Sequence, residues 1–525
     1  MNVVAPAAEF EEERRSSQLA SLLLVFVAGW VVLWFVHALG YWEDDAYIHL
    51  EFARSVSRGQ GFAFNGHIVY GDTSPLWVWL LVGFHTLIPN WMAAGKTLTA
   101  VAAVFALSGV FAFARSLTSQ LGRAQSRLFA AAMLMVLVVN PYFGYWAFSG
   151  MEALTAAGLV CWGLVAVTGN SFAEPIAPRR FLLGCLCAGL APLLRPEMGF
   201  FTILLGILLF LRWVNLPLAF APKLQLFFAG FAMVAVPGIA WAAYAMHAFR
   251  SILPNTNAAK RAAPQDSVLR HLVQIYAFGF PLVLAGILLL IGWLAFGRRL
   301  RTHVPLEAVG GALNAGGWLL FLWTAVNSLF YVVDHTYVQT RYIFVTAPVL
   351  TVALLAVGRK LWPKLYLAGV VFGVVFGVCI SLLATWPLIR NKIGVDRDYA
   401  ALAAFLKTLP PNDAVAHYSI GEAAFLSEHP IIDLGGITRP GIIPFLWDVA
   451  DNRRIWWAHE QGARYEVLDS SPEPGSTLVW SRMIPATGWY LNPQRYKAMD
   501  SLRVWKLPSS PTIPLPTDMP TDDQP

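Results

Sequence analysis

Long uncharged runs of apolar residues dominate this 525-residue chain and restrict what it can fold into. About 11 of them are apolar enough to enter a bilayer, and a run of about 20 residues crosses its hydrocarbon core as a helix. Helices are expected because backbone polar groups cannot stay unpaired in lipid. The predicted spans are Leu19–Leu39, Ala93–Ala114, Leu128–Trp146, Ala153–Val167, Phe181–Leu194, Gly199–Leu211, Leu224–Met246, Leu272–Phe296, Gly310–Val333, Tyr342–Val357 and Leu365–Trp386.

The composition supports a polytopic membrane protein. Hydrophobic residues make up 57% of the chain and charged residues 13%, whereas soluble domains contain about 25% charged residues. An ordinary soluble enzyme, a disordered protein and a basic nucleic-acid binder are therefore excluded, and no nucleic-acid partner is expected. The net charge is only +6. We interpret the four cysteines, which all lie in apolar runs, as small core residues: Cys161, Cys185, Cys187 and Cys379.

The basic residues predict how the chain is oriented in the membrane. Most of them map to one side of the predicted spans, which the positive-inside rule makes the cytoplasm. This requires that the Trp-rich segment Ser74–Pro89 is a juxtamembrane or re-entrant helix instead of a crossing. The N-terminus then lies inside and the C-terminus outside. The basic groups are Arg14/Arg15, Arg115/Arg123/Arg127, Arg179/Arg180, Arg212/Lys223, Arg298/Arg299/Arg301 and Arg359/Lys360/Lys364.

The chain divides into a membrane part and a more polar C-terminal part. We expect a cytoplasmic segment at 1–17, a transmembrane domain at 18–387 with its first outer loop at 41–92, an extracytoplasmic α/β domain at 388–507 and a disordered tail at 508–525. The α/β domain is predicted from a helix at Tyr399–Leu406 followed by short β-branched runs. The predicted strands are Ala414–Tyr418, Pro430–Leu434, Tyr465–Leu468, Thr477–Trp480 and Val504–Leu507.

The first outer loop carries three consecutive acids, Glu43, Asp44 and Asp45, directly after the first span. One interpretation is structural, because acids stabilise the start of a helix, here an amphipathic one at 46–56. The other is chemical: one aspartate activates an incoming hydroxyl or holds a metal at the membrane surface. Tyr47 and His49 on the same helix are further candidates. The histidines lack the helical two-His spacing of a zinc site.

Four basic residues break the positive-inside pattern and map to outer ends or loops: Arg195, Arg250, Lys260 and Arg341. Cations in this position are suited to the phosphate of a lipid substrate, which arginine binds with two parallel hydrogen bonds. The alternative is that they pair with local acids such as Glu197, Asp266 or Asp334, or reach to lipid headgroups.

Two further motifs lie at the outer boundary. SGMEA places Glu152 at the end of a span, where a carboxylate is either functional or half of a capping box with Ser149. In LPNTNAAKR, an outer loop, Pro254 and Asn255 suggest a turn, and Asn257 and Lys260 offer polar contacts. Asn255 is a further candidate for binding the donor.

These motifs, EDDAYIHLEFARSVSRGQGFAFN, GDTSPLW, SGMEA, RPE, LPNTNAAK and TRY in this order, resemble those of bacterial membrane glycosyltransferases of the GT-C superfamily. The chain is most similar to mycobacterial terminal arabinofuranosyltransferases and related arabinosyl- or mannosyltransferase-like proteins, over Trp42 to Tyr342. The resemblance implies an α-helical polytopic membrane protein with a C-terminal extracytoplasmic α/β domain, in the bacterial inner membrane, with its active site on the extracytoplasmic face.

The resemblance also implies roles for residues. Asp44 and Asp45 occupy the position of the catalytic aspartate, with Asp45 preferred, and Arg195, Lys260 and Arg341 surround donor phosphate and sugar. Two departures concern the sugar. An aromatic pair often follows Asn-Thr in the family, where this chain has Asn257-Ala258, and Asp is common where it has Glu197.

The implied reaction moves a sugar, arabinofuranose by preference, from a polyprenyl-phosphate donor to a cell-envelope glycan or protein acceptor. No cofactor is required, and a divalent cation is possible. The alternatives are a mannosyltransferase with a polyprenyl-phosphate-mannose donor, a lipid-linked sugar flippase or transporter, and a non-catalytic scaffold. Glu152 would matter as a partner carboxylate if the reaction retained configuration.

Overall fold

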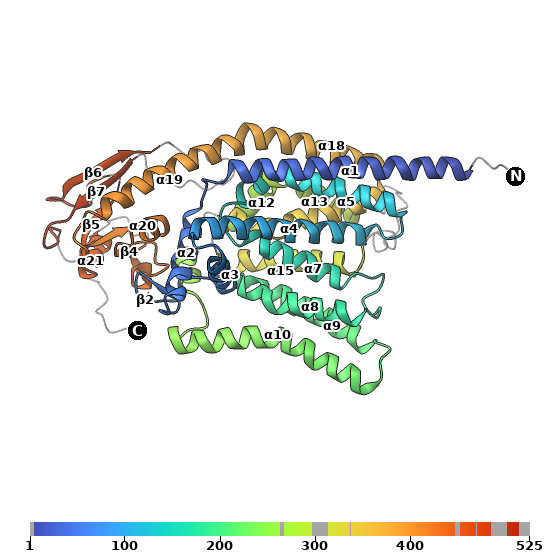
Figure 1. The fold of residues 1–525 in the computed structure, drawn as a ribbon, viewed down its shortest axis with the longest axis horizontal. Coiled ribbons are helices and arrows are strands. Elements are labelled where there is room, and N and C mark those ends of the chain that lie inside the picture. Colours follow the sequence, from blue (N-terminus) through green and yellow to red (C-terminus); the bar gives the residue numbers. More distant parts are fainter. Residues whose placement is uncertain are drawn as a thin grey trace.

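The computed structural model describes residues 5–262, 267–296, 313–336, 338–446, 452–468, 470–484 and 501–513. It is an elongated helical bundle with a small α/β domain at one end (Figure 1). The N-terminal end of the first helix and the α/β domain lie at opposite ends of the bundle, which agrees with an odd number of crossings. We call the end next to the α/β domain the domain end.

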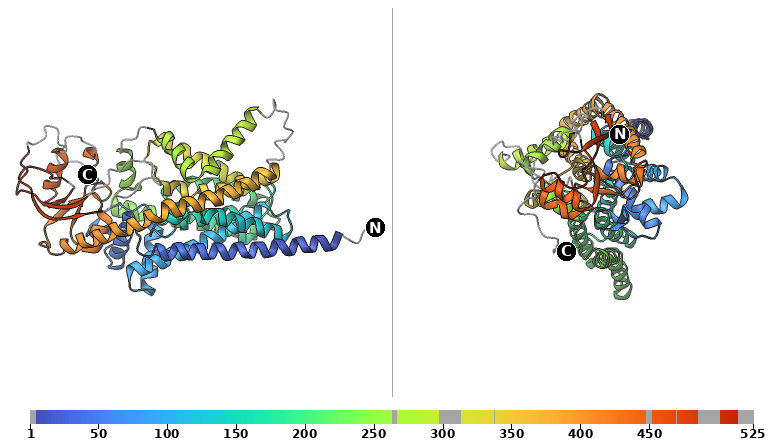
Figure 2. Two further views of the ribbon diagram at one scale, coloured as in Figure 1. Left: turned by 90° about the horizontal axis from the view of Figure 1, so that it is seen from above. Right: turned by 90° about the vertical axis from the view of Figure 1, so that its left-hand side faces the viewer.

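Six helical segments among the described residues are long and apolar enough to cross a membrane, and the polytopic helical class is thereby confirmed. The last of them joins α18 and α19 through a π-helical turn into one helix of 44 residues (Figure 2). The segments are α1 (Ala5–His37), α4 (Trp91–Leu117), α9 (Gly199–Val214) with the turn before it, α10 (Phe220–Phe249), α15 (Ala315–Asp334), and α18 (Pro363–Ile380) with α19 (Trp386–Leu406).

Other predicted spans form shorter helices. The single helix predicted over Leu128–Trp146 is wrong, because Asn140 and Pro141 end α5 and start α6. Asn140 caps the new helix by accepting a hydrogen bond from the backbone N–H of Tyr142 at 2.9 Å. These shorter helices are α5 (Arg123–Val138), α6 (Pro141–Trp146), α7 (Ala153–Ala166), α8 (Pro178–Leu190), α16 (Thr340–Phe344) and α17 (Ala347–Leu361).

The span predicted over Leu272–Phe296 is also broken. It forms α12 (Val268–Gly279) and α13 (Pro281–Phe296), which meet at a bend of 111°. Proline disfavours helical backbone at the residue before it and lacks the N–H that would continue the helix, so Pro281 accounts for the break. Arg298, Arg299 and Arg301 and the start of the span predicted over Gly310–Val333 lie outside the described residues.

The first outer loop packs at the domain end. It contains α2 (Asp44–Ser57), a hairpin of β1 (Ala63–Phe64) and β2 (His67–Ile68), and α3 (Pro75–Leu87). With 13 residues, α3 is too short for a full crossing, as expected for Ser74–Pro89. The loop after α10 contributes α11 (Asn255–Ala262), and two 3₁₀ turns, η1 (Ala191–Leu193) and η2 (Pro196–Met198), flank Arg195.

The α/β domain contains a five-stranded sheet with the order β4-β3-β5-β7-β6. The first three strands are parallel, and β7 and β6 extend the sheet antiparallel. All five predicted strands are present, within a few residues of their predicted bounds. The end of the predicted disordered tail, 514–525, lies outside the described residues. The elements are β3 (Ala414–His417), α20 (Ile420–Ser427), β4 (Ile431–Asp433), η4 (Pro440–Phe445), α21 (Asn452–Glu460), β5 (Ala463–Val467), β6 (Thr477–Met483) and β7 (Ser501–Lys506).

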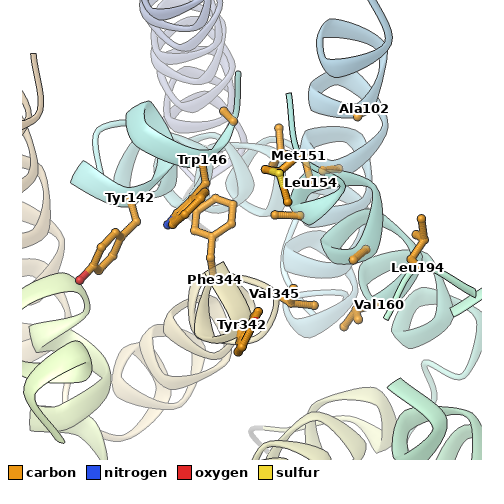
Figure 3. Packing of buried hydrophobic residues seen from close by; sticks show 14 of the residues in the cluster. Ala102, Tyr142, Trp146, Met151, Leu154, Val160, Leu194, Tyr342, Phe344 and Val345 are labelled. Carbon is orange, nitrogen blue, oxygen red and sulfur yellow. The ribbon is translucent and has the colours of Figure 1, made fainter. Parts of the chain in front are cut away.

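A continuous apolar core joins the bundle to the first outer loop. Figure 3 shows Trp146 of α6 facing Phe344 of α16, with Met151 and Leu154 beside them. Trp146 also donates its indole N–H to the hydroxyl of Thr340 at 3.0 Å. This packing fixes α16 against the start of α7, and these two elements carry several of the candidate site residues.

Candidate active site

The three acids at the start of α2 have three different sets of partners. Glu43 occupies the N-cap position but caps no backbone N–H. Its carboxylate accepts a hydrogen bond from the hydroxyl of Tyr41 at 2.7 Å and lies 3.2 Å from Nζ of Lys392. Asp44 and Asp45, although adjacent, point to different parts of the molecule. The interpretation that these acids only stabilise the helix start therefore does not account for them.

Asp45 pairs with Arg341 of α16, and the distance between Oδ2 and Nη2 is 2.6 Å. The arginine side chain is 9% exposed, whereas that of Asp45 is 34% exposed, so a substrate could reach the carboxylate. Burial alone would raise the pKa of Asp45, but the charge and hydrogen bond of Arg341 hold that pKa below its ordinary value. Asp45 is therefore an ionised, accessible hydrogen-bond acceptor.

Three cations surround the ring of Tyr342, which follows Arg341 in α16. The guanidinium carbon of Arg195 lies 4.1 Å from the ring centroid, Nζ of Lys260 4.9 Å and the guanidinium carbon of Arg341 5.4 Å. Burial would raise the pKa of Tyr342, but these cations, Lys260 first, lower it. We call Arg195, Lys260, Arg341 and Tyr342 the cation cluster.

Carboxylates hold two of these cations in place. Arg195 donates to Glu152 at 2.8 Å and to Glu197 at 2.7 Å, and Tyr331 also donates to Glu197 at 3.0 Å. Lys260, in contrast, has no carboxylate within 4 Å among the parts of the chain that the structure describes. The cluster thus offers one cation without an ion pair beside two that are precisely oriented.

His49 lies behind Arg195, between two buried carboxylates. Its Nδ1 is 2.6 Å from Oδ2 of Asp72, and its Nε2 is 3.5 Å from Oε2 of Glu152. Burial would lower the pKa of His49, but Asp72 and Glu152 raise it to about 10. Burial would likewise raise the pKa of Glu152, but His49 and Arg195 bring it far below its ordinary value. His49, Glu152 and Arg195 are therefore charged at neutral pH.

Glu152 owes its position to the glycine of SGMEA. Gly150 has a φ of +90°, and a Cβ atom there would lie 2.5 Å from the ring of Trp42, so only glycine fits. The capping-box interpretation is wrong: Glu152 precedes α7 without a side-chain cap, and Ser149 donates to the carbonyl of Trp146. The turn instead directs Glu152 toward Arg195 and His49.

Asp44 faces the α/β domain and not the cation cluster. Its carboxylate accepts hydrogen bonds from the backbone N–H groups of Glu422 at 2.9 Å and Gly421 at 3.3 Å, at the start of α20. Burial is the main reason that the pKa of Asp44 rises to about 6. Tyr47 also faces this side, with its ring 5.9 Å from that of Phe425. Both residues join α2 to the α/β domain.

Arg250 and Asn255 are not part of the cluster either. Arg250 is exposed at the end of α10, with a φ of +58°, and forms no ion pair with any described residue. Asn255 starts α11, where its backbone N–H donates to the carbonyl of Tyr70 at 3.0 Å. The acid predicted as a partner, Asp334, pairs with Arg261 instead. Asp266 lies outside the described residues.

The structure thus gathers seven of the predicted residues: Asp45, His49, Glu152, Arg195, Glu197, Lys260 and Arg341. Sequence reasoning missed Tyr342 and Asp72 as site residues, although TRY and GDTSPLW were noted as motifs. In the described ranges, no group of three or more His, Cys, Asp or Glu residues could hold a metal ion. The arrangement can bind an anion beside an accessible carboxylate.

Comparisons with known proteins identify the fold. No protein-family model matches the sequence, and no curated protein matches it. Among solved structures, ArnT from Cupriavidus metallidurans bound to undecaprenyl phosphate aligns with a TM-score of 0.55 at 15% identity, over 93% of this chain and 98% of ArnT. Apo ArnT aligns with a TM-score of 0.54 at 14% identity, over 94% and 99%.

This likeness covers nearly the whole of both chains and shows a common fold. The protein is a polytopic membrane protein that shares the fold of ArnT, with a helical membrane domain followed by a small α/β domain.

Proposed function

We propose that this chain is a glycosyltransferase that moves a sugar from a polyprenyl-phosphate donor to an acceptor hydroxyl. The observation that carries the proposal is the cation cluster, with Asp45 attached to it through Arg341. This places an anion site and an accessible carboxylate side by side at one end of a membrane bundle. The fold shared with ArnT, whose structure holds undecaprenyl phosphate, supports a lipid phosphate as the anion.

The donor phosphate would bind between Lys260, Arg195 and Arg341. Lys260 lacks a described carboxylate partner, so it can pair with the phosphate without giving up an ion pair. Arginine suits phosphate because its planar guanidinium donates two parallel hydrogen bonds. Glu152 and Glu197 keep Arg195 oriented before the donor arrives, and fixed dipoles and charges of this kind need little reorganisation during the reaction.

In the reaction, the acceptor oxygen forms a bond to the anomeric carbon, and the bond between that carbon and the phosphate oxygen breaks. The acceptor proton moves to Asp45, and the phosphate leaves with one additional negative charge. Arg341 shifts toward this charge and so weakens its pairing with Asp45. The proton affinity of Asp45 therefore rises as the proton arrives, which makes it a better general base.

The sugar and the acceptor come from the sequence resemblance. It favours arabinofuranose, with mannose as the alternative, and a cell-envelope glycan or protein as the acceptor. The domain end would face the extracytoplasmic side of a bacterial inner membrane, so the α/β domain would meet the acceptor. The chemistry described requires no cofactor, and a divalent cation would be an addition to it.

A transfer assay with the full chain in nanodiscs tests this function. The protein is offered polyprenyl-phosphate arabinofuranose or polyprenyl-phosphate mannose with short glycan acceptors. We expect Asp45→Asn to lower kcat by about 10²–10⁴-fold, which is the usual contribution of a general base, while donor binding persists. Asp398→Asn, which removes a carboxylate paired with Arg482 in the α/β domain, is the matched control. Equal activity of Asp45→Asn and wild type would refute the role of Asp45.

A transporter is the outcome to distinguish. If the wild-type protein binds these donors and moves them across a vesicle membrane without transferring sugar, the flippase alternative replaces the proposal. If it transfers sugar from one donor only, the same assay identifies the sugar.

A further inference from the structure

The GDTS segment of the first outer loop, residues 71–74, forms no hydrogen bond or ion pair with the cation cluster among the described residues, but it bonds to the residue before Arg195. We infer that Asp72 and Ser74, together with His49, form a positioning device that fixes Arg195 and thereby sets the affinity for the donor phosphate. The inference rests on the proposed function, because it takes the phosphate to be the ligand of Arg195.

The device holds the backbone next to Arg195. Oδ1 of Asp72 accepts a hydrogen bond from the backbone N–H of Ser74 at 2.6 Å, which orders the turn. The hydroxyl of Ser74 then donates to the carbonyl of Leu194, the residue before Arg195, at 2.7 Å. Asp72 and Ser74 are buried, so water does not compete for these bonds. These bonds therefore tie the loop to the residue that follows the η1 turn.

The device also holds the side chain of Arg195. Oδ2 of Asp72 pairs with Nδ1 of His49 at 2.6 Å, His49 faces Glu152 at 3.5 Å, and Glu152 accepts from Arg195 at 2.8 Å. All four residues are buried, and their charges alternate along the chain of contacts. Removing one member leaves its neighbour as an unpaired buried charge, which is costly. Oδ2 of Asp72 is thus linked to Arg195 through His49 and Glu152.

The two paths converge on one guanidinium. Arg195 is held by Glu152 on one side and Glu197 on another, and its guanidinium carbon lies 4.1 Å from the ring centroid of Tyr342. The device contacts neither Asp45 nor Arg341 through a hydrogen bond among the described residues. Its loss should therefore weaken phosphate binding more than it slows the chemical step.

The charge on His49 gives the device a measurable pH signature. The charged groups around His49 are Asp72, Glu152, Asp45 and Arg195, and the carboxylates hold its pKa near 10 against the effect of burial. In Asp72→Asn the nearest carboxylate charge is gone while burial remains, so the pKa of His49 falls. His49 then loses its proton as the pH rises. Glu152, no longer shared with a charged His49, then competes with the donor phosphate for Arg195.

The test measures binding of polyprenyl phosphate without sugar to the full chain in nanodiscs, between about pH 6 and about pH 9. The quantity compared is the ratio of the variant Kd to the wild-type Kd at each pH, because the lipid phosphate itself titrates. We expect a ratio of about 10 for His49→Gln at every pH and a ratio for Asp72→Asn that rises with pH. At saturating donor, kcat should fall by less than about threefold in both.

Control variants and two alternative substitutions keep the test valid if Asp72→Asn fails to fold. Asp398→Asn in α19 and His429→Gln in the α/β domain change the same residue types away from the cation cluster and should leave the ratio near one. If Asp72→Asn does not fold, Ser74→Ala, which breaks only the bond to Leu194, and His49→Gln carry the test. Unchanged binding in both would overturn the inference.

The remaining outcomes separate the two proposals. A ratio for Asp72→Asn that is large but independent of pH would overturn the role of the His49 charge, since a purely structural defect behaves in this way. Wild-type binding with no effect of any of the three variants would overturn the inference and leave the proposed function standing. A wild-type protein that binds no polyprenyl phosphate would overturn both.

Discussion

Asp44 and Asp45 are neighbours in the chain but belong to two differently charged regions. Around Asp45, charges of opposite sign balance: Arg195, Lys260 and Arg341 stand against Asp45, Glu152 and Glu197, and each carboxylate contacts a cation. Here a carboxylate stays ionised, as the lowered pKa of Asp45 indicates.

Around Asp44, acids outnumber cations. Glu43, Asp44, Asp396 and Glu422 lie near one another between α2, α19 and α20, and Lys392 is the cation paired among them. We call these four acids the acid cluster. Burial raises the pKa of Glu422 to about 10 and that of Asp44 to about 6. At neutral pH a proton therefore removes the charge of Glu422, and Asp44 takes up its proton at a higher pH than an ordinary aspartate does.

The difference shows that buried charge serves two purposes in this molecule. A balanced cluster keeps its ions, and under the proposed function it would bind the donor phosphate. A cluster with excess acid binds protons and acts as a contact between domains. Which of the two a carboxylate joins depends on the direction of its side chain, and one residue along the first turn of α2 is enough to change it.

Among the predicted changes, Arg341→Ala, in the balanced cluster around Asp45, should have the largest effect. It removes a cation of the cluster and leaves Asp45 without its partner, and truncating one member of such a pair costs about 2–5 kcal/mol. We expect kcat/KM for sugar transfer to fall by at least about 30-fold, measured in the transfer assay. Arg250→Ala is the comparison, because Arg250 is exposed and outside the cluster. An equally large loss in Arg250→Ala would contradict the cluster as described.

Asp44→Ala should affect the acid cluster and the contact between α2 and the α/β domain. It removes the acceptor for the N–H groups of Gly421 and Glu422, which should weaken the contact between α2 and the α/β domain by about 1–3 kcal/mol. Hydrogen exchange of these two amides near pH 6 should accelerate. Asp45→Asn serves as the control and should leave their exchange unchanged. Protection that survives in Asp44→Ala would show that the contact does not depend on this carboxylate.

The pH dependence of stability should distinguish the two aspartates. Burial raises the pKa of Asp44 from 3.8 to about 6, so the folded protein binds this proton more tightly than the unfolded chain. The stabilisation is complete below about pH 4 and is lost as the pH rises through about 6, by about 3 kcal/mol. The melting temperature of the wild type minus that of Asp44→Asn should therefore fall over this range. If this difference in melting temperature rises with pH instead, folding lowers the pKa of Asp44, and the prediction is wrong.

Glu422→Gln should have the smallest effect. With a pKa near 10, Glu422 is protonated at neutral pH, and glutamine closely resembles a neutral carboxylic acid. We expect a change in stability of less than about 0.5 kcal/mol at pH 7. Glu152→Gln makes the same substitution at an ionised, buried carboxylate and should cost about 3–5 kcal/mol. Similar melting temperatures for the two variants would remove the distinction between the clusters.

Much of the fold could be predicted from the sequence because it depends on local patterns. The apolar runs gave the membrane class, and β-branched runs gave the strands of the α/β domain. The breaks in two of the predicted spans lie at Pro141 and Pro281, so they were readable from proline, but length and hydropathy alone merged the pieces. The span predicted over Tyr342–Val357 is also divided, into α16 and α17.

The candidate site could be predicted only in part. Arg195, Lys260 and Arg341 were singled out because they lie on the unexpected side of the predicted spans. A charge near lipid is energetically costly and is therefore a candidate for a functional role. The partner of Asp44 is a pair of backbone N–H groups more than 370 residues away along the chain, and no side-chain pattern marks it. Asp72 was hidden for a related reason, since it acts through His49 and Ser74.

The long helix made by α18 and α19 affects how the protein responds to its lipid surroundings. At about 1.5 Å per residue, its 44 residues are roughly 66 Å long, about twice the hydrocarbon thickness of a bilayer. Its far half carries Lys392, which pairs with Glu43 just before α2. A thicker or thinner bilayer would therefore raise or lower the α/β domain and the first outer loop together. Through the pair of Lys392 with Glu43, the helix ties the first outer loop to the α/β domain that follows it.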